Sequence, residues 1–196
     1  VNPGASPGIL NINGNVTVGT NETFTVELGG TTAGTGAGFH DQVAVVGTVT
    51  IGSGVTLDPV LFGGFSPTLG DMFTIIDNDG ADAVTGMLQY DGMALNEGDQ
   101  FLQDGVVYGI SYAGGDGNDV VLGVVSPATV YVDDSFMQTN GGAIVDADLG
   151  TAGSQAATMG VNAFTTLGTA LATVATNGTI IVNGGAYAET IALDNT

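Results

Sequence analysis

The chain has 196 residues, with 20 acidic side chains, one histidine and neither lysine nor arginine, which gives a formal net charge of -20. Because no cationic side chain can neutralise phosphate groups, nucleic acids and anionic membranes are poor partners for this chain. Charged residues make up only 10% of the sequence and hydrophobic residues 43%, so the chain is apolar enough to fold around a sizeable core. The carboxylates have no cationic side chains to offset their mutual repulsion, so we expect divalent cations as partners.

Two further classes of structure are excluded by composition. The chain has no cysteine, so it has no disulfide, thiolate metal site or cysteine nucleophile. It also has no uninterrupted apolar stretch of membrane length, which argues against membrane insertion. Because the chain starts at Val1 and ends where a strand pattern has just resumed, we expect it to be a processed chain or an excised segment.

Short runs rich in Val, Ile, Thr and Phe alternate with glycines over the first 125 residues and predict strands joined by tight turns. The predicted strands cover residues 9–14, 15–19, 23–30, 42–52, 55–62, 72–77, 106–115 and 118–125. The hexapeptide GNVTVG from Gly14 recurs as GTVTIG from Gly47. This spacing is too long for one hairpin and suits a coil of a solenoid or a pair of equivalent strands.

The acidic turn DNDGAD places Asp77, Asp79 and Asp82 at alternating positions with oxygen ligands, as at the start of a calcium loop. It lacks the distal bidentate glutamate of an EF-hand. The alternative is a type I′ hairpin turn, because Asn78, Asp79 and Gly80 all tolerate positive φ angles.

The nonapeptide GGDGNDVVL, residues 114–122, matches one turn of the calcium-binding G-G-x-G-x-D-x-U-x repeat. Because such repeats build each site from adjacent turns, one copy supplies half a site at best. We therefore expect its glycines to form a tight turn that is followed by the last strand of the domain, Asp119 to Val125. Asp116 and Asp119 remain calcium ligands only if another loop or another subunit brings the missing oxygens.

We place a domain boundary near Ser126-Pro127, which separates a Gly-rich β domain (1–125) from a second domain (126–196). In the second domain the sequence predicts a strand over 129–136, a long polar loop over 138–160 and a helix that starts with Asn162 as N-cap and ends at Gly178. Strands over 179–185 and from 188 follow. Further calcium ligands are expected where the loop returns to the first strand, at Asp133, Asp134, Asp146 and Asp148.

Catalysis is not expected. Elimination of the pectate-lyase type needs cationic groups that the chain lacks, and a glycoside hydrolase built from the paired carboxylates 133/134 or 146/148 would have only Tyr131 and Phe136 as neighbouring aromatic residues. The His40-Asp41 pair is not accompanied by a serine in a nucleophile elbow. A single histidine in a Gly-rich loop is usually a turn residue.

Two sets of phrases resemble known families. PGASPGILNINGNVTV, GDMFTIIDNDGADAVTG and YGISYAGGDGNDVVL resemble segments of giant bacterial surface proteins of the adhesin type that carry autotransporter-associated β-strand repeats. TVYVDDSF followed by residues 162–191 is similar to the opening of a right-handed parallel β-helix of the pectin-lyase-like superfamily. The resemblance implies a helix that caps the solenoid and a first rung formed by GTIIV.

These observations predict a mainly β fold: a β-solenoid or β-sandwich-like N-terminal part, then one capping helix that opens a parallel β-helix. The predicted function is an extracellular or cell-surface, non-catalytic structural or adhesive protein. Identical subunits would join head to tail by strand addition, and Ca²⁺ would stabilise the acidic loops. The alternative is a carbohydrate-binding module of a larger polysaccharide-processing protein that recognises surface glycans, although only 7% of the chain is aromatic. A glycan array would separate the two.

Overall fold

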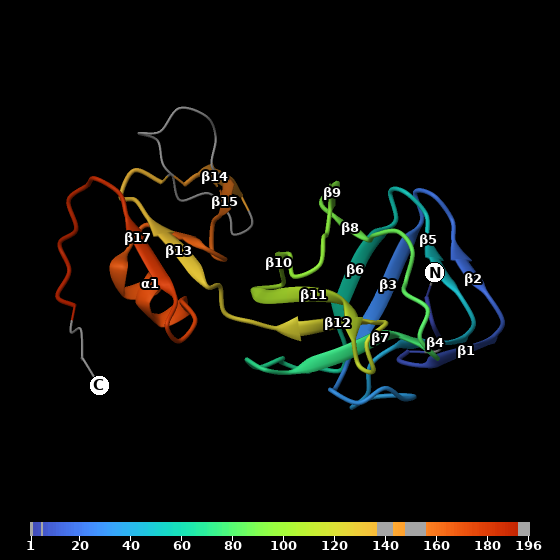
Figure 1. Cartoon of the computed structure of the whole chain (residues 1–196). Coiled ribbons are helices and arrows are strands. Elements are labelled where there is room, and N and C mark those ends of the chain that lie inside the picture. Colours follow the sequence, from blue (N-terminus) through green and yellow to red (C-terminus); the bar gives the residue numbers. More distant parts are fainter. Residues whose placement is uncertain (1, 5, 137–142, 148–155, 192–196) are drawn as a thin grey trace. The chain divides into compact units, whose positions relative to one another are not determined.

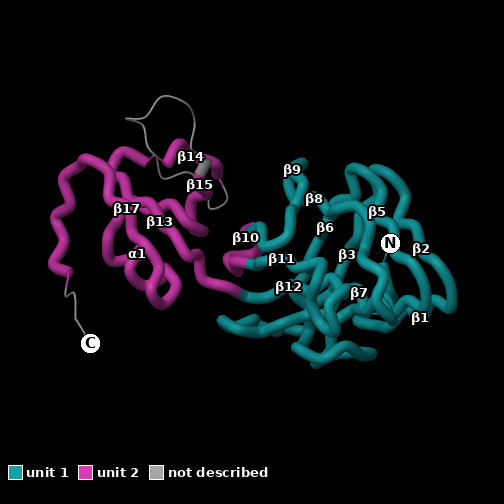
Figure 2. The backbone as a smooth tube through the Cα atoms, in the orientation of Figure 1, with its two compact units in different colours: residues 1–100, 108–124 teal, residues 101–107, 125–196 magenta. Residues whose placement is uncertain are grey.

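The computed structural model describes residues 2–4, 6–136, 143–147 and 156–191, and the chain divides into two compact units (Figure 2). Unit 1 comprises residues 1–100 and 108–124, and unit 2 comprises residues 101–107 and 125–196. The fold is mainly β with one short helix, as the sequence predicts, and its N-terminal part is a β-solenoid. In the described part of the chain, no helix has the length and apolar character needed to span a bilayer.

Parallel coils form the body of unit 1. The first coil contains β1 (Ile9–Asn13), β2 (Val16–Val18) and β3 (Thr23–Leu28), the second contains β4 (Gln42–Val46), β5 (Val49–Ile51) and β6 (Thr56–Leu61), and the third contains β7 (Met72–Asn78) and β8 (Gln89–Tyr90). Each strand of the first coil pairs in parallel with its equivalent in the second. β4 and β6 pair in the same way with β7 and β8.

The coil repeats every 33 residues, and polar side chains reinforce this register. Val16 lies opposite Val49, so the recurring hexapeptide marks equivalent strands of successive coils, as predicted. Asn15 Oδ1 accepts a hydrogen bond from the Thr48 N–H, 33 residues further on (3.0 Å). Inward side chains alternate with outward ones along each strand, which places Phe24, for example, in the core.

The far end of unit 1 is closed by a reversal of the chain. β12 (Asp119–Val124) pairs antiparallel with β7, and β11 (Val106–Gly114) pairs antiparallel with β12. β10 (Gln100–Gln103) follows in the same sheet, whose order is β1-β4-β7-β12-β11-β10, and β9 (Met93–Ala94) pairs antiparallel with β8. Within unit 1, Figure 1 shows β1 and β2 at one end and β11 and β12 at the other.

Unit 2 is built around β13 (Thr129–Val132), which lies between two parallel neighbours, β16 (Ala163–Phe164) and β17 (Thr179–Val182). The helix α1 (Leu167–Thr173) packs on this sheet and contributes the buried side chain of Ala170. β14 (Ile144–Asp146) and β15 (Ala156–Thr158) pair antiparallel, so part of the predicted polar loop is a two-stranded sheet. Residues 138–142 and 148–155 of that loop lie outside the described residues.

The predicted helix is too long at both ends. Residues 163–164 form a strand beside Tyr131 and Val132, and the helix has Thr166 rather than Asn162 as its N-cap. It ends at Thr173, and the positive φ angle after it belongs to Asn177 (62°), not to Gly178. Strand pairing overrides the helical spacing because it satisfies backbone hydrogen bonds at the sheet edge. The strand predicted from residue 188 is also absent over its described part, 188–191.

Candidate functional site

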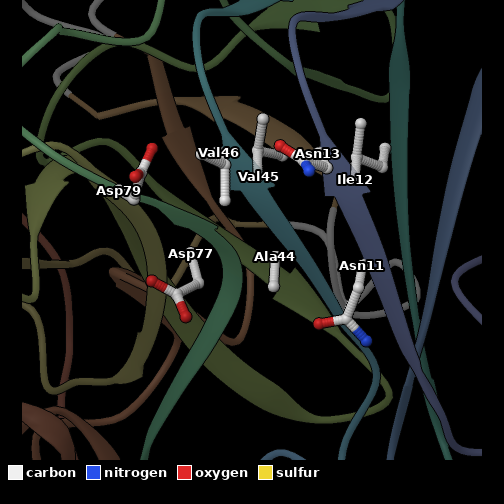
Figure 3. Close-up of a pocket in the computed structure, with 8 residues that line it drawn as sticks. All are labelled: Asn11, Ile12, Asn13, Ala44, Val45, Val46, Asp77 and Asp79. Carbon is white, nitrogen blue, oxygen red and sulfur yellow. The ribbon is translucent and has the colours of Figure 1, made fainter.

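The outward face of the parallel sheet β1-β4-β7 carries a hollow of about 390 Å³ (Figure 3). Equivalent positions of successive coils line it, because outward side chains repeat with the coil. The lining residues are Asn11, Ile12 and Asn13 from β1, Ala44, Val45 and Val46 from β4, and Asp77 and Asp79 at the end of β7. The hollow thus combines amides, carboxylates and an apolar floor, and no aromatic side chain lines it.

The acidic turn DNDGAD lies where β7 leaves its sheet and the chain continues through the third coil toward β8. β7 pairs in parallel with β4, so the alternative of a type I′ hairpin turn is wrong. Asp79 Oδ1 accepts a hydrogen bond from the Gly47 N–H (2.9 Å), which ties the turn to the second coil. The carboxylates of Asp77 and Asp82 are exposed, whereas Asn78 between them is fully buried.

The nonapeptide GGDGNDVVL forms the tight turn between β11 and β12, as predicted. The Gly117 N–H donates to Gly114 O (2.7 Å), and Gly115 and Gly117 have φ angles of 55° and 121°. The strand that follows begins at Asp119, in agreement with the sequence. Asp116 lies in the turn and is exposed, while Asp119 is buried at the start of β12.

The two acidic segments, more than 30 residues apart in the chain, meet at this point. Asp119 Oδ1 accepts a hydrogen bond from the Asn78 N–H (2.9 Å, 41 residues away). The backbone carbonyl of Asp82 accepts from the side-chain amides of both Asn78 (2.6 Å) and Asn118 (3.1 Å). We call this set of residues, Asn78, Asp82, Asp116, Asn118 and Asp119, the asparagine junction.

Electrostatics at the asparagine junction disfavour the charged form of Asp119. Burial raises the pKa of the Asp119 carboxyl, the hydrogen bond from Asn78 lowers it, and the charges of Asp77 and Asp116 raise it further. The carboxylates of Asp77 and Asp116 therefore lie close enough to act on Asp119. No cationic side chain exists in the chain to offset this repulsion.

The carboxylates predicted as calcium ligands in unit 2 make local backbone contacts. Asp133 is buried and accepts from the N–H and hydroxyl of Ser135, and Asp134 Oδ2 accepts from the Ala186 N–H (2.8 Å). Asp146 ends β14, and Asp148 lies outside the described residues. These contacts describe turns of the chain, and they leave calcium binding in this unit a prediction.

His40 and Asp41 are adjacent in sequence, but their side chains bind different partners. His40 is buried, with Nδ1 3.0 Å from Gly30 O and Nε2 3.3 Å from Thr74 O, and burial lowers its pKa, partly offset by these two carbonyls and by the charge of Asp41. Asp41 is buried and accepts from the backbone N–H groups of Gly8 (2.6 Å) and Glu27 (2.9 Å). The hydrogen bonds of both residues therefore stabilise the corner of the coil that precedes β4.

Among the residues that the structure describes, no three His, Asp or Glu side chains lie together in a group that could hold a metal ion by itself. A metal site would therefore need amide or carbonyl oxygens as well. The sequence pointed to the carboxylates of the junction but not to the side chains of Asn78 and Asn118 as ligands. Comparison with known proteins gives no match to a family model, a curated protein or a solved structure.

Proposed function

We propose that this chain is a non-catalytic structural subunit of an extracellular or cell-surface fibre, in which copies join head to tail by β-strand addition. The observation that carries the proposal is that parallel edge strands with exposed apolar side chains occur in both units, β1 in unit 1 and β17 in unit 2. Exposed edges of this kind are templates for pairing with another chain. Because the two edges differ in sequence, their contact would be heterologous, and a heterologous contact whose rotation does not close a ring produces a filament.

The β1 edge offers a row of backbone donors and acceptors. The Gln42 N–H donates to Gly8 O (3.0 Å), which fixes the side of the strand that faces β4. Since successive residues of a strand point their backbone groups to opposite sides, the N–H groups of Ile9, Asn11 and Asn13 face away from β4. Ile9 and Leu10 are each 37% exposed, so the edge also has apolar surface to bury.

The β17 edge has the same properties. The N–H groups of Thr179 and Asn183 donate to Ala128 O and Val132 O of the β13 segment (both 2.8 Å). By alternation, the N–H groups of Ile180 and Val182 face the other side. Ile181 and Val182 are 39% and 47% exposed. A strand added here would extend the parallel sheet β16-β13-β17.

The non-catalytic part of the proposal rests on what the carboxylates do. Asp41, Asp79, Asp119, Asp133 and Asp134 each accept a hydrogen bond from a backbone N–H. These side chains hold turns and coil corners, which supports a structural role for them. Bound Ca²⁺ would relieve the repulsion among the carboxylates and stabilise the subunit. The resemblance of the sequence to giant bacterial surface proteins supports the location.

Replacement of Asn11 by proline tests the proposal, because proline removes one N–H of the β1 edge and is tolerated on edge strands. We expect the wild-type chain to form filaments as protein concentration rises, seen by electron microscopy and sedimentation velocity. Asn11→Pro should stay monomeric, whereas the matched control Asn11→Ala, which keeps the N–H, should assemble. Val182→Pro against Val182→Ala tests the other edge in the same way. Wild-type chains that remain monodisperse monomers at high concentration, with and without calcium, would disprove strand addition.

A second candidate function is a carbohydrate-binding module, favoured by the hollow on the sheet β1-β4-β7. Its amides and carboxylates could hydrogen-bond sugar hydroxyls above the apolar floor. It ranks below assembly because no aromatic side chain lines the hollow. Monomers that fail to assemble but bind a defined glycan on an array would favour this function instead.

A further inference from the structure

We propose that the asparagine junction is a calcium site, with the side-chain oxygens of Asn78, Asn118, Asp116 and Asp119 as ligands. This proposal deepens the proposed function by locating the ion that would stabilise the subunit. It joins two sequence segments that are each incomplete as calcium sites. The antiparallel pairing of β12 with β7 brings the turn after β7 and the turn between β11 and β12 together, and there the Asn78 N–H donates to Asp119 Oδ1.

The first argument is that two buried oxygens have no protein partner. Neither Asn78 Oδ1 nor Asn118 Oδ1 accepts a hydrogen bond from any described residue, although Asn78 is fully buried and Asn118 is only 3% exposed. A buried polar atom without a partner destabilises the fold, so such atoms normally face a ligand or an ordered water. Two of them at one junction indicate that something binds there.

The second argument is that the orientation of both amides is fixed. Both Nδ2 groups donate to the same carbonyl oxygen, Asp82 O, at 2.6 and 3.1 Å. Rotation of either amide by 180° would set its oxygen against that carbonyl oxygen and lose the hydrogen bond. The amide oxygens therefore remain as acceptors only, and an acceptor can be satisfied by a cation or by a water molecule.

The third argument is the charge around these oxygens. Asp119 lies beside Asn78 through the 2.9 Å hydrogen bond, Asp116 belongs to the turn that precedes Asp119, and Asp77 is the chain neighbour of Asn78. An environment of several carboxylates and two amide oxygens favours a cation over a neutral water. Calcium takes about six to eight oxygen ligands in irregular geometry, whereas magnesium demands a near-octahedral shell. An all-oxygen set of amides and carboxylates from two turns suits calcium.

Calorimetric titration of the full chain with CaCl2, at protein concentrations where it is monomeric, tests the site. We expect one calcium ion to bind per junction and to raise the Tm, while MgCl2 at the same ionic strength raises it less. Asp116→Asn removes a ligand charge from an exposed turn residue and should weaken calcium binding at least about tenfold, because ligand charge sets affinity at such sites. Asp91→Asn removes the same charge from an exposed turn outside the junction and should leave binding unchanged.

The titration also distinguishes a bound calcium ion from general charge screening and from bound water. If calcium and magnesium raise the Tm equally, and Asp116→Asn responds as the wild type does, then the effect is general screening and the site is disproved. The absence of any calcium binding would likewise disprove it and would assign the two amide oxygens to water. Because the measurement uses monomers, its failure leaves strand addition untouched, and failed assembly in the presence of bound calcium would disprove strand addition alone.

Discussion

Gly115 shows how a single residue of the β11–β12 turn is fixed by two constraints at once. Its φ angle is 55°, and a Cβ atom there would overlap Asp119 Oδ2. Alanine would therefore require a left-handed backbone, which costs about 1–2 kcal/mol, and would displace a buried carboxylate from its hydrogen bond, which costs about 1–3 kcal/mol. We expect Gly115→Ala to lower the free energy of unfolding by about 2–5 kcal/mol in urea titrations.

Gly63 provides the matched control for this substitution. Its φ angle is 64°, and an added Cβ would meet only Ala37 Cβ at 3.8 Å, an ordinary contact. Gly63→Ala should therefore show the backbone cost alone. If Gly115→Ala and Gly63→Ala lower the free energy of unfolding equally, then the Asp119 side chain moves away at no cost. The close approach of Gly115 to Asp119 would then not contribute to stability.

At the scale of elements, α1 depends on a residue that follows it by about 20 positions. Glu189 accepts from the N–H groups of Leu167 (3.0 Å) and Gly168 (2.9 Å), so its carboxylate caps the first turn of the helix. Glu189→Gln removes the charge and one acceptor, and we expect a loss of about 0.5–1 kcal/mol in local stability. Hydrogen exchange should show lower protection of the amides of α1.

Glu22→Gln is the control for the helix cap. Glu22 is exposed in unit 1, and the substitution removes one negative charge without touching α1. If both variants lower the protection of α1 equally, the effect is a change in net charge and Glu189 is not a cap. A loss confined to Glu189→Gln supports the capping role.

At the scale of the whole molecule, charge repulsion opposes folding. The chain has a net charge of -20 and neither lysine nor arginine. His40 is therefore the only side chain that could form an ion pair with a carboxylate. Raising NaCl from about 0.01 M to about 1 M shortens the Debye length from about 30 Å to about 3 Å and screens the repulsion. We expect the Tm to be higher at high salt, by about 2–4 °C for each kcal/mol by which the free energy of unfolding rises.

The same salt series at lower pH is the control for this prediction. Near the sequence pI of about 4.1, many carboxylates are protonated, and the gain from salt should shrink. A Tm that is independent of salt at pH 7, or one that rises equally at both pH values, would show that repulsion between carboxylates is not what limits stability.

The mainly β class, most of the strands of unit 1 and the equivalence of the segments that begin at Gly14 and Gly47 are predictable from the amino-acid sequence. These follow from alternation and from turn residues, which are local properties of the chain. The sequence also indicated that GGDGNDVVL forms a tight turn before a closing strand. The oxygen-rich turns from which calcium ligands are predicted are recognisable for the same reason, since ligand spacing within one turn is local.

How these elements combine depends on contacts between distant parts of the chain. Helical spacing extended the predicted helix to Asn162, but residues 163–164 pair with β13 instead, because backbone hydrogen bonds to a distant strand outweigh local propensity. Glu189 as a helix cap and the meeting of Asn78 with Asn118 and Asp119 depend on contacts between residues 21 to 41 positions apart. No local pattern encodes such contacts, since they arise only when each unit is folded.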